Sequence, residues 1–183
     1  MKRFLLVIDM LNDFIDPIGA LFCGPTALAI VDPIKDLIKT FRENGHKVYF
    51  LCDNHAFNDK EFERFPKHAI EGGWGQEIID GLVDVSKDII IPKTRYSAFY
   101  NTNLEKNLLL NGYLPSNSEA TVVGVCTNIC VMDSVGWLAN MDYSIKVPKN
   151  CVADFDQSMH EFALTRMQNL YGVNTDPSPK YTI

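Results

Sequence analysis

Cys130 is a candidate catalytic residue, because its type and its position in the sequence both suggest chemistry. The apolar run at 121–125 predicts a buried strand, and a short polar turn connects it to a helical pattern that begins near Cys130. We expect Thr127 or Asn128 to cap this helix, so that the positive helix end lowers the pKa of the Cys130 thiol. The alternative is an unreactive buried thiol, because most intracellular cysteines pack rather than react.

Charged side chains follow three further predicted strands. Because the carboxyl ends of parallel strands meet at one edge of a sheet, we expect these side chains to lie close to Cys130. The Cys130 thiolate could then attack an acyl carbon, while Asp9 moves the proton and Lys93 stabilises the charged pair. Taken singly, Asp9 could be a helix cap or turn residue, and Lys93 could be an exposed surface lysine. The residues are Asp9 after strand 4–8, Asp53 after strand 48–52 and Lys93 at the end of strand 88–91.

A second candidate site is a metal centre. Asp53 and His55 stand two residues apart at the end of a strand, so their side chains project to the same side. His68, from the long loop that follows, can close on a divalent ion such as zinc or iron. Glu61 or Glu63 could supply a fourth protein ligand, with water in the remaining positions.

The other histidines and cysteines are expected to have structural roles. His46 stands at a predicted helix end and His160 in an amphipathic helix, both outside the candidate metal cluster. Cys23, Cys52 and Cys151 are interpreted as packed thiols. None of the five cysteines forms a Cys-X-X-Cys pair, and we expect a reducing, cytoplasmic environment.

Length and charge exclude several classes of protein. The 183 residues suit one domain over 1–183, and the hydrophobic content of 46% is that of a globular chain. The net charge of −6 argues against nucleic acid and against an anionic membrane surface. No run approaches the roughly 18 apolar residues of a membrane span, and the run at 4–8 ends at Asp9 without a signal-peptide cleavage site.

Alternating strand and helix patterns predict an α/β fold of three layers, with a mostly parallel sheet between helices. The last helix is expected to turn Phe162, Met167 and Leu170 inward, and the tail beyond Asn174 to be poorly ordered or packed along the surface. The predicted strands are 4–8, 48–52, 88–91, 121–125 and 143–147, and the predicted helices are 32–45, 76–82, 103–110 and 156–172.

Five ordered motifs resemble one known family. They are Ile-Asp-Met-Leu-Asn-Asp-Phe at 8–14, Asp-Asn-His at 53–55, Phe-Pro-Lys-His at 65–68, Lys-Thr-Arg-Tyr-Ser-Ala-Phe at 93–99 and Gly-Val-Cys-Thr-Asn-Ile-Cys-Val at 124–131. Through them the chain from Phe4 to about Val173 resembles the nicotinamidases of the isochorismatase-like cysteine hydrolases. The resemblance implies the isochorismatase-like hydrolase fold and a homo-oligomer.

The resemblance also implies a mechanism. Asp9, Lys93 and Cys130 would form a triad that hydrolyses nicotinamide to nicotinate and ammonia through a thioester, in NAD salvage, with pyrazinamide as a further substrate. A cis peptide before Cys126 would let the N–H groups of Cys126 and Cys130 form an oxyanion hole. A metal loop, which isochorismatases and carbamoyl amidases lack, would hold the pyridine nitrogen through the ion or its waters.

A planar aromatic amide needs flat apolar partners. Phe14, Phe65 and Tyr96 stand on the predicted loops around the site, and we expect them to bind the substrate. Phe14 and Phe65 as plain core residues are the alternative.

The sequence also departs from the family pattern. Asn128 stands where many members carry aspartate, which removes a charge near the nucleophile. Cys126 replaces a small alanine and adds a thiol that could oxidise against Cys130. A carboxylate ligand such as Glu61 leaves iron and manganese open beside zinc, which is the first expectation. The competing functions are a hydrolase of the same fold for another small amide and a non-catalytic member that binds metal or a protein.

Overall fold

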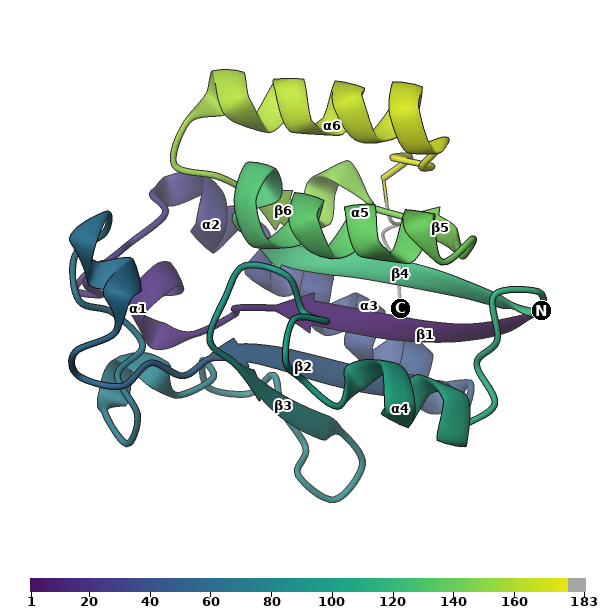
Figure 1. Cartoon of the computed structure of the whole chain (residues 1–183), viewed down its shortest axis with the longest axis horizontal. Helices are drawn as coiled ribbons and strands as arrows, with labels where there is room; N and C mark the ends of the chain where they lie inside the picture. Colours follow the sequence, from purple (N-terminus) through teal and green to yellow (C-terminus); the bar gives the residue numbers. More distant parts are fainter. Residues whose placement is uncertain (178–183) are drawn as a thin grey trace.

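A six-stranded parallel sheet forms the middle layer of the computed structural model, which describes residues 1–177 (Figure 1). The order of the main strands is β3-β2-β1-β4-β5, and β6 also pairs with β4. The strands are β1 (Lys2–Ile8), β2 (Lys47–Asp53), β3 (Ile89–Lys93), β4 (Ser118–Val125), β5 (Ser144–Lys146) and β6 (Val152–Ala153). With helices on both faces, this sheet confirms the predicted three-layer α/β fold.

The central strand β1 is apolar on both faces because it has no face exposed to water. Leu5 and Val7 pack on one side of the sheet, and Leu6 and Ile8 pack on the other. A strand covered on both sides needs such a continuous apolar run. Its parallel pairing with β2 and β4 brings the carboxyl ends of the three strands to the same edge, on the left in Figure 1.

Five helices cover the sheet, namely α2 (Pro25–Ala29), α3 (Val31–Glu43), α4 (Leu104–Leu110), α5 (Met132–Asn140) and α6 (Gln157–Tyr171). The residues of α2 and α3 pack on one face, behind the sheet in Figure 1, and those of α4, α5 and α6 belong to the core on the other face. In α3, Ile34, Leu37, Ile38 and Phe41 recur at helical spacing, and all four are buried. Within the described residues, no helix is both long and apolar enough to cross a membrane.

Shorter helical turns lie near the strand ends. They are α1 (Asn12–Ile15), η1 (Lys60–Glu63), η2 (Trp74–Gln76), η3 (Thr127–Val131) and η4 (Lys149–Cys151). Of these, η3 is π-helical and the other η elements are 3₁₀ turns.

The predicted helix at 76–82 is wrong. Gln76 ends the turn η2, residues 80–82 form another turn, and between them the backbone around Ile78 bonds to the segment after β1. The N–H of Asn12 donates to the carbonyl of Glu77, and the N–H of Ile79 donates to that of Met10. Tertiary pairing therefore overrides the weak helical pattern of this segment.

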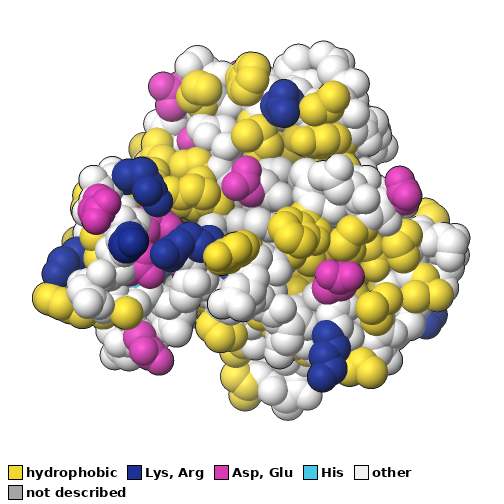
Figure 2. Space-filling model, in the orientation of Figure 1, with side chains coloured by type: hydrophobic (Ala, Val, Ile, Leu, Met, Phe, Trp, Pro, Cys, Tyr) yellow, Lys and Arg dark blue, Asp and Glu magenta, His cyan; other side chains and the backbone are white. Residues whose placement is uncertain are grey.

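The predicted inner face of α6 is also wrong in part. Met167 is fully buried, but Phe162 and Leu170 are 54% and 57% exposed. The helix packs through Ala163, Leu164 and Met167, a face that the sequence disguises because apolar residues also occur on the opposite side. The space-filling view shows many such hydrophobic side chains on the molecular surface (Figure 2).

The start of the C-terminal tail is packed against the body of the protein. The carbonyl of Asn174 accepts the N–H of Val147 at 2.8 Å, and Thr175 is buried. The expected surface packing is therefore confirmed for these residues, whereas 178–183 lie outside the described residues.

Gly124 allows β4 to lie against β1, and its replacement should destabilise the fold. Its φ is +113°, and a Cβ built there would lie 2.0 Å from the carbonyl oxygen of Ile8. We expect Gly124→Ala to lower the free energy of unfolding by about 3 kcal/mol or more, because strain and overlap combine. Denaturant unfolding would measure this loss.

Gly45→Ala is the matched control for this prediction. Gly45 also has a positive φ, of +72°, but a Cβ there would meet no atom within 4 Å. Its cost should be only about 1 to 2 kcal/mol. Equal losses in the two variants would show that close strand contact at Gly124 is unimportant.

Candidate active site

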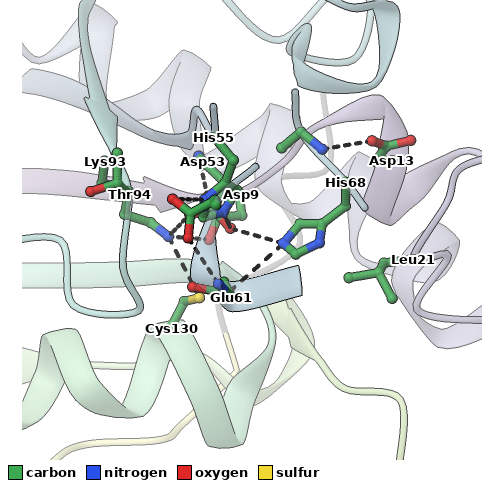
Figure 3. A network of polar contacts seen from close by, with 12 residues as sticks. Asp9, Asp13, Leu21, Asp53, His55, Glu61, His68, Lys93, Thr94 and Cys130 are labelled. Carbon is green, nitrogen blue, oxygen red and sulfur yellow. Dashed lines mark hydrogen bonds and ion pairs between the residues drawn. The ribbon is translucent and has the colours of Figure 1, made fainter. Parts of the chain in front are cut away.

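A buried lysine lies between two carboxylates at the carboxyl edge of the sheet (Figure 3). The register of β2 with β3 pairs Asp53 with Lys93, and Asp9 directly follows β1. Lys93 Nζ lies 2.7 Å from Asp9 Oδ2 and 2.6 Å from Asp53 Oδ1. All three side chains are almost completely buried. The structure thus brings together three of the residues that the sequence singled out.

The backbone holds Asp9 in place. Its φ is +50°, an uncommon value for a residue with a side chain. Its N–H donates to the carbonyl of Leu51 at 2.9 Å, and its Oδ1 accepts the N–H of Asp53 at 2.9 Å. These bonds offset the local strain and aim the other carboxylate oxygen at Lys93.

The two carboxyl groups differ in their affinity for protons. Burial and the nearby charge of Asp53 raise the pKa of Asp9 to about 7. Burial alone would also raise the pKa of Asp53, but Lys93 and His55 lower it to about 2. Burial opposes the charge of Lys93, yet Asp53 and Asp9 together raise the pKa of its ammonium above the ordinary value. Asp53 therefore stays ionised, while Asp9 can exchange a proton near neutral pH.

Cys130 lies in η3, and its Sγ is 3.5 Å from Lys93 Nζ. The predicted α-helical cap is wrong: η3 is π-helical, Cys126 occupies the capping position, and no side chain caps it. The predicted lowered pKa of the thiol is also wrong. Burial raises the pKa of Cys130 above its ordinary value, although Lys93 opposes this. The resting thiol therefore keeps its proton and needs a base, and Asp9 is the nearby acceptor.

The turn before η3 has the predicted unusual backbone. The peptide bond between Val125 and Cys126 is cis, as the family resemblance implied. The Cys126 thiol, however, lies against Cys23, with 3.4 Å between the sulfur atoms, whereas the Cys130 thiol approaches Lys93. The five cysteines are all free.

Four side chains beside this network could hold a metal ion. Asp53, His55, Glu61 and His68 each offer one ligand atom, these atoms all lie within 4.8 Å of one another, and all four residues are buried. Of the two glutamates considered, the structure places Glu61 in the cluster and leaves Glu63 exposed. Asp53 belongs to both groups, because its Oδ1 contacts Lys93 and its Oδ2 faces the histidines.

The nitrogen and oxygen atoms of this cluster that have no hydrogen-bond partner within residues 1–177 are suitable ligands for a divalent cation. His55 Nε2 and Glu61 Oε2 are buried and make no hydrogen bond to any described residue. His68 Nδ1 lies 2.7 Å from the carbonyl oxygen of Pro66. Since this oxygen can only accept, Nδ1 carries the proton, and Nε2 keeps a lone pair that faces the cluster. Burial raises the pKa of Glu61 and lowers that of His68. A cation would compensate buried acceptors that otherwise have no partner.

Loop contacts carry these ligands to the sheet. The N–H of His55 donates to the carbonyl of Ala69 at 2.9 Å, which brings His68 beside the end of β2. Asp13 Oδ2 accepts the N–H of Ala69 at 2.7 Å and anchors the loop from the other side. Asp59 accepts the N–H of Glu61 at the start of η1, and its other oxygen lies 3.3 Å from His55 Nδ1. No pattern in the sequence marked Asp13 or Asp59 as part of the site.

An apolar cavity opens onto both groups and encloses about 320 Å³, including the part open to solvent. Phe14, Phe65 and Tyr96 line it, where the sequence placed them. Leu21, Ile129 and Phe155 also line it and were not predicted. The available signal for Phe155 was its place after a strand, but β6 has two residues and is too short to recognise as a pattern.

The remaining histidines lie outside the metal cluster, as expected. His46 packs against the ring of Phe41, with 5.6 Å between ring centroids. His160 Nδ1 lies 2.9 Å from the hydroxyl of Thr127 and so contacts the turn that carries the nucleophile. Cys52 and Cys151 are buried packing residues, and burial raises the pKa of both thiols.

Comparison with protein families identifies the group to which this site belongs. Residues 3–176 match the isochorismatase domain. The chain belongs to the isochorismatase family. One relative is PncA of Bacillus subtilis, which is named an uncharacterized isochorismatase family protein. It is 35% identical to this chain, and the match covers 94% of this chain and 97% of the relative. A crystal structure of PncA, described there as a nicotinamidase/pyrazinamidase, has a TM-score of 0.89 and covers 96% of this chain and 100% of that chain.

Two other solved structures show the chemical range of proteins that are similar to this chain. An N-carbamoylsarcosine amidase from Thermoplasma acidophilum is 30% identical, has a TM-score of 0.87 and covers 100% of both chains. A pyrazinamidase from Pyrococcus horikoshii in complex with zinc is 25% identical, has a TM-score of 0.87 and covers 97% of this chain and 100% of that chain. The chain is a hydrolase of the isochorismatase family.

Removing the charge of Lys93 should destabilise this site. We expect Lys93→Met to lower the free energy of unfolding by about 3 to 5 kcal/mol, because Asp9 and Asp53 would keep a buried negative charge without its partner. Denaturant unfolding would be measured with a metal chelator present, so that no metal ion contributes to stability. Lys87→Met is the control, since exposed Lys87 pairs with Asp84 at the surface, and its unfolding midpoint should not change. Equal stability of both variants would contradict the prediction.

Proposed function

We propose that this chain is a nicotinamidase, a cysteine amidohydrolase that converts nicotinamide to nicotinate and ammonia through a thioester. The observation that carries the proposal is the buried Lys93, which joins Asp9 beside Cys130 to the Asp53 end of a metal-binding cluster. Residues of both groups line the same apolar cavity. In the space-filling view, acidic and basic side chains gather at the left, the edge that carries the strand ends (Figure 2).

The first half-reaction forms the thioester. Asp9 accepts the proton of the Cys130 thiol as Sγ attacks the amide carbon, and the carbonyl electrons move to oxygen. The N–H groups of Cys126 and Cys130 would bind this oxyanion. Asp9 then gives its proton to the amide nitrogen, the C–N bond breaks, ammonia leaves, and the carbonyl re-forms as a thioester. Lys93 stays charged and offsets part of the negative charge of the site while the proton moves.

The second half-reaction returns the enzyme to its first state. Asp9 takes a proton from water as the water oxygen attacks the thioester carbon. The C–S bond breaks, the thiolate of Cys130 leaves, and the proton on Asp9 returns to it. The balance is one amide and one water consumed, with one acid and one ammonia formed.

Asp53, His55, Glu61 and His68 would hold one divalent metal ion. When bound, the ion would act as a Lewis acid that attracts the lone pair of the pyridine nitrogen, directly or through its waters. Zinc is the first candidate, which the zinc complex of the Pyrococcus horikoshii pyrazinamidase supports, with iron or manganese as alternatives. Phe14, Phe65 and Tyr96 would stack against the ring and keep bulk water away from the thioester.

The names of similar proteins support this substrate. The Bacillus subtilis structure described as a nicotinamidase/pyrazinamidase covers nearly the whole chain at 35% identity. We extend the proposal to pyrazinamide as a second substrate, to a cytoplasmic role in NAD salvage, and to a homo-oligomer.

A second candidate is hydrolysis of another small amide by the same residues. The similarity to N-carbamoylsarcosine amidase favours it, because that neighbour covers the full chain at 30% identity. Turnover of N-carbamoyl amino acids together with poor turnover of nicotinamide would support this second candidate against the first.

Purified, reduced and metal-replete protein should release ammonia from nicotinamide. Cys130→Ala should abolish the release, because no nucleophile remains, and Asp9→Asn should lower kcat at least about 1000-fold. Cys151→Ala is the control, since it removes a buried thiol outside the cavity and should keep most of the activity. Ammonia release that survives in Cys130→Ala would exclude the thioester route, and none from the unaltered protein would exclude nicotinamide as the substrate.

Metal binding should raise thermal stability through the named ligands. Adding zinc to the metal-free protein at about 100 times its Kd should raise Tm by roughly 5 to 10 °C, because it binds only the folded cluster. His68→Ala should lose most of this shift, whereas His46→Ala, outside the cluster, should keep it. Equal shifts in the two variants would place the metal elsewhere.

A further inference from the structure

The turn that carries the nucleophile is held from outside by the start of α6 and the residues before it. The hydroxyl of Thr127 lies 2.9 Å from His160 Nδ1. Asp154 Oδ2 accepts the backbone N–H of Asn128 at 2.8 Å, and Asp154 Oδ1 accepts the side-chain amide of the same residue at 3.2 Å. Two consecutive residues between Cys126 and Cys130 are therefore tied to this segment.

Asp154 contacts the part of the turn that its internal bonds leave unsupported. The carbonyl of Cys126 accepts the N–H groups of Ile129 at 3.1 Å and of Val131 at 3.2 Å. The N–H of Asn128 does not join this set and donates to Asp154 instead. The position of Asn128, midway between Cys126 and Cys130, thus depends on a side chain from a distant part of the sequence.

The carboxylate of Asp154 is buried, with 6% of the residue exposed. Burial raises its pKa, while the backbone N–H groups of Asn128, Asp156 and Phe155 oppose that rise. Its chain neighbour Phe155 lines the substrate cavity. A buried carboxylate is costly unless it is well bonded, so its two bonds to Asn128 stabilise one geometry of the turn.

We propose that Asp154 is a positioning residue that holds the Cys126–Cys130 turn in its reactive geometry, and that Asn128 and Asp154 act as one amide–carboxylate pair. This inference rests on the proposed function of the same site. Position 128 supplies the amide of this pair, and position 154 supplies the carboxylate. Two carboxylates at these positions would face each other without a proton between them.

The test is a set of variants in which the pair is broken and then exchanged. Asp154→Ala leaves the N–H of Asn128 without its acceptor and should lower kcat for nicotinamide about 10- to 100-fold, with KM within about 3-fold, because the substrate cavity remains. Asn128→Asp brings two carboxylates together and should lower kcat at least about 10-fold. The exchanged double variant Asn128→Asp with Asp154→Asn restores both hydrogen bonds and should return kcat to within about 3-fold of the original.

Asp156→Ala is the matched control. Asp156 lies two residues away and caps α6 at the surface by accepting the N–H groups of Ser158 and Met159, without a contact to the turn. This variant removes the same charge and should keep kcat within about 3-fold. If Asp154→Ala also kept its kcat, or the exchanged pair were no better than Asn128→Asp alone, the positioning role would be wrong.

A second measurement needs no substrate. The rate at which iodoacetamide alkylates Cys130, located by mass spectrometry, should fall about 5-fold or more in Asp154→Ala and recover in the exchanged pair, because the thiol loses its place beside Asp9 and Lys93. Equal alkylation rates in all variants would overturn the inference. If nicotinamide were not a substrate, this series would still decide the role of Asp154, so the two failures are distinguishable.

Discussion

The buried ammonium of Lys93 pairs with two carboxylates that could not otherwise share the interior of the protein. Asp9 and Asp53 each lie within 2.7 Å of it, and all three residues are almost completely buried. Because charges in such a place are costly unless they are paired, the ends of β1, β2 and β3 must meet in one register. The active site therefore depends on the same ion network that the sheet has to accommodate.

Asp53 connects the two halves of the site. One of its oxygens contacts Lys93, and the other faces His55 and His68. Its pKa stays low because Lys93 and His55 outweigh burial, so it keeps its charge while the pKa of Asp9 rises toward neutrality. A single carboxylate thus belongs both to the group that could hold a metal ion and to the ion network around Asp9.

The sequence predicted the strands and the chemical residues better than the contacts between them. Continuous apolar runs marked the central strands, and polar residues at their ends identified Asp9, Asp53, Lys93 and Cys130, because parallel strands place their carboxyl ends together. The helix at 76–82 failed, since its backbone pairs with a segment more than 60 residues away. The lowered pKa of Cys130 failed because complete burial outweighs the attraction of Lys93.

Residue type and periodicity by themselves determined the α/β fold, the edge of the sheet that carries the site and the set of candidate nucleophile, carboxylates and metal ligands. These follow from local patterns, which the sequence displays directly. Only the tertiary structure decided that Glu61 rather than Glu63 faces the histidines, that the Cys126 thiol lies against Cys23, and that Asp154 holds Asn128. Each of these choices depends on distances across the fold, and the linear sequence does not contain such distances in any local pattern.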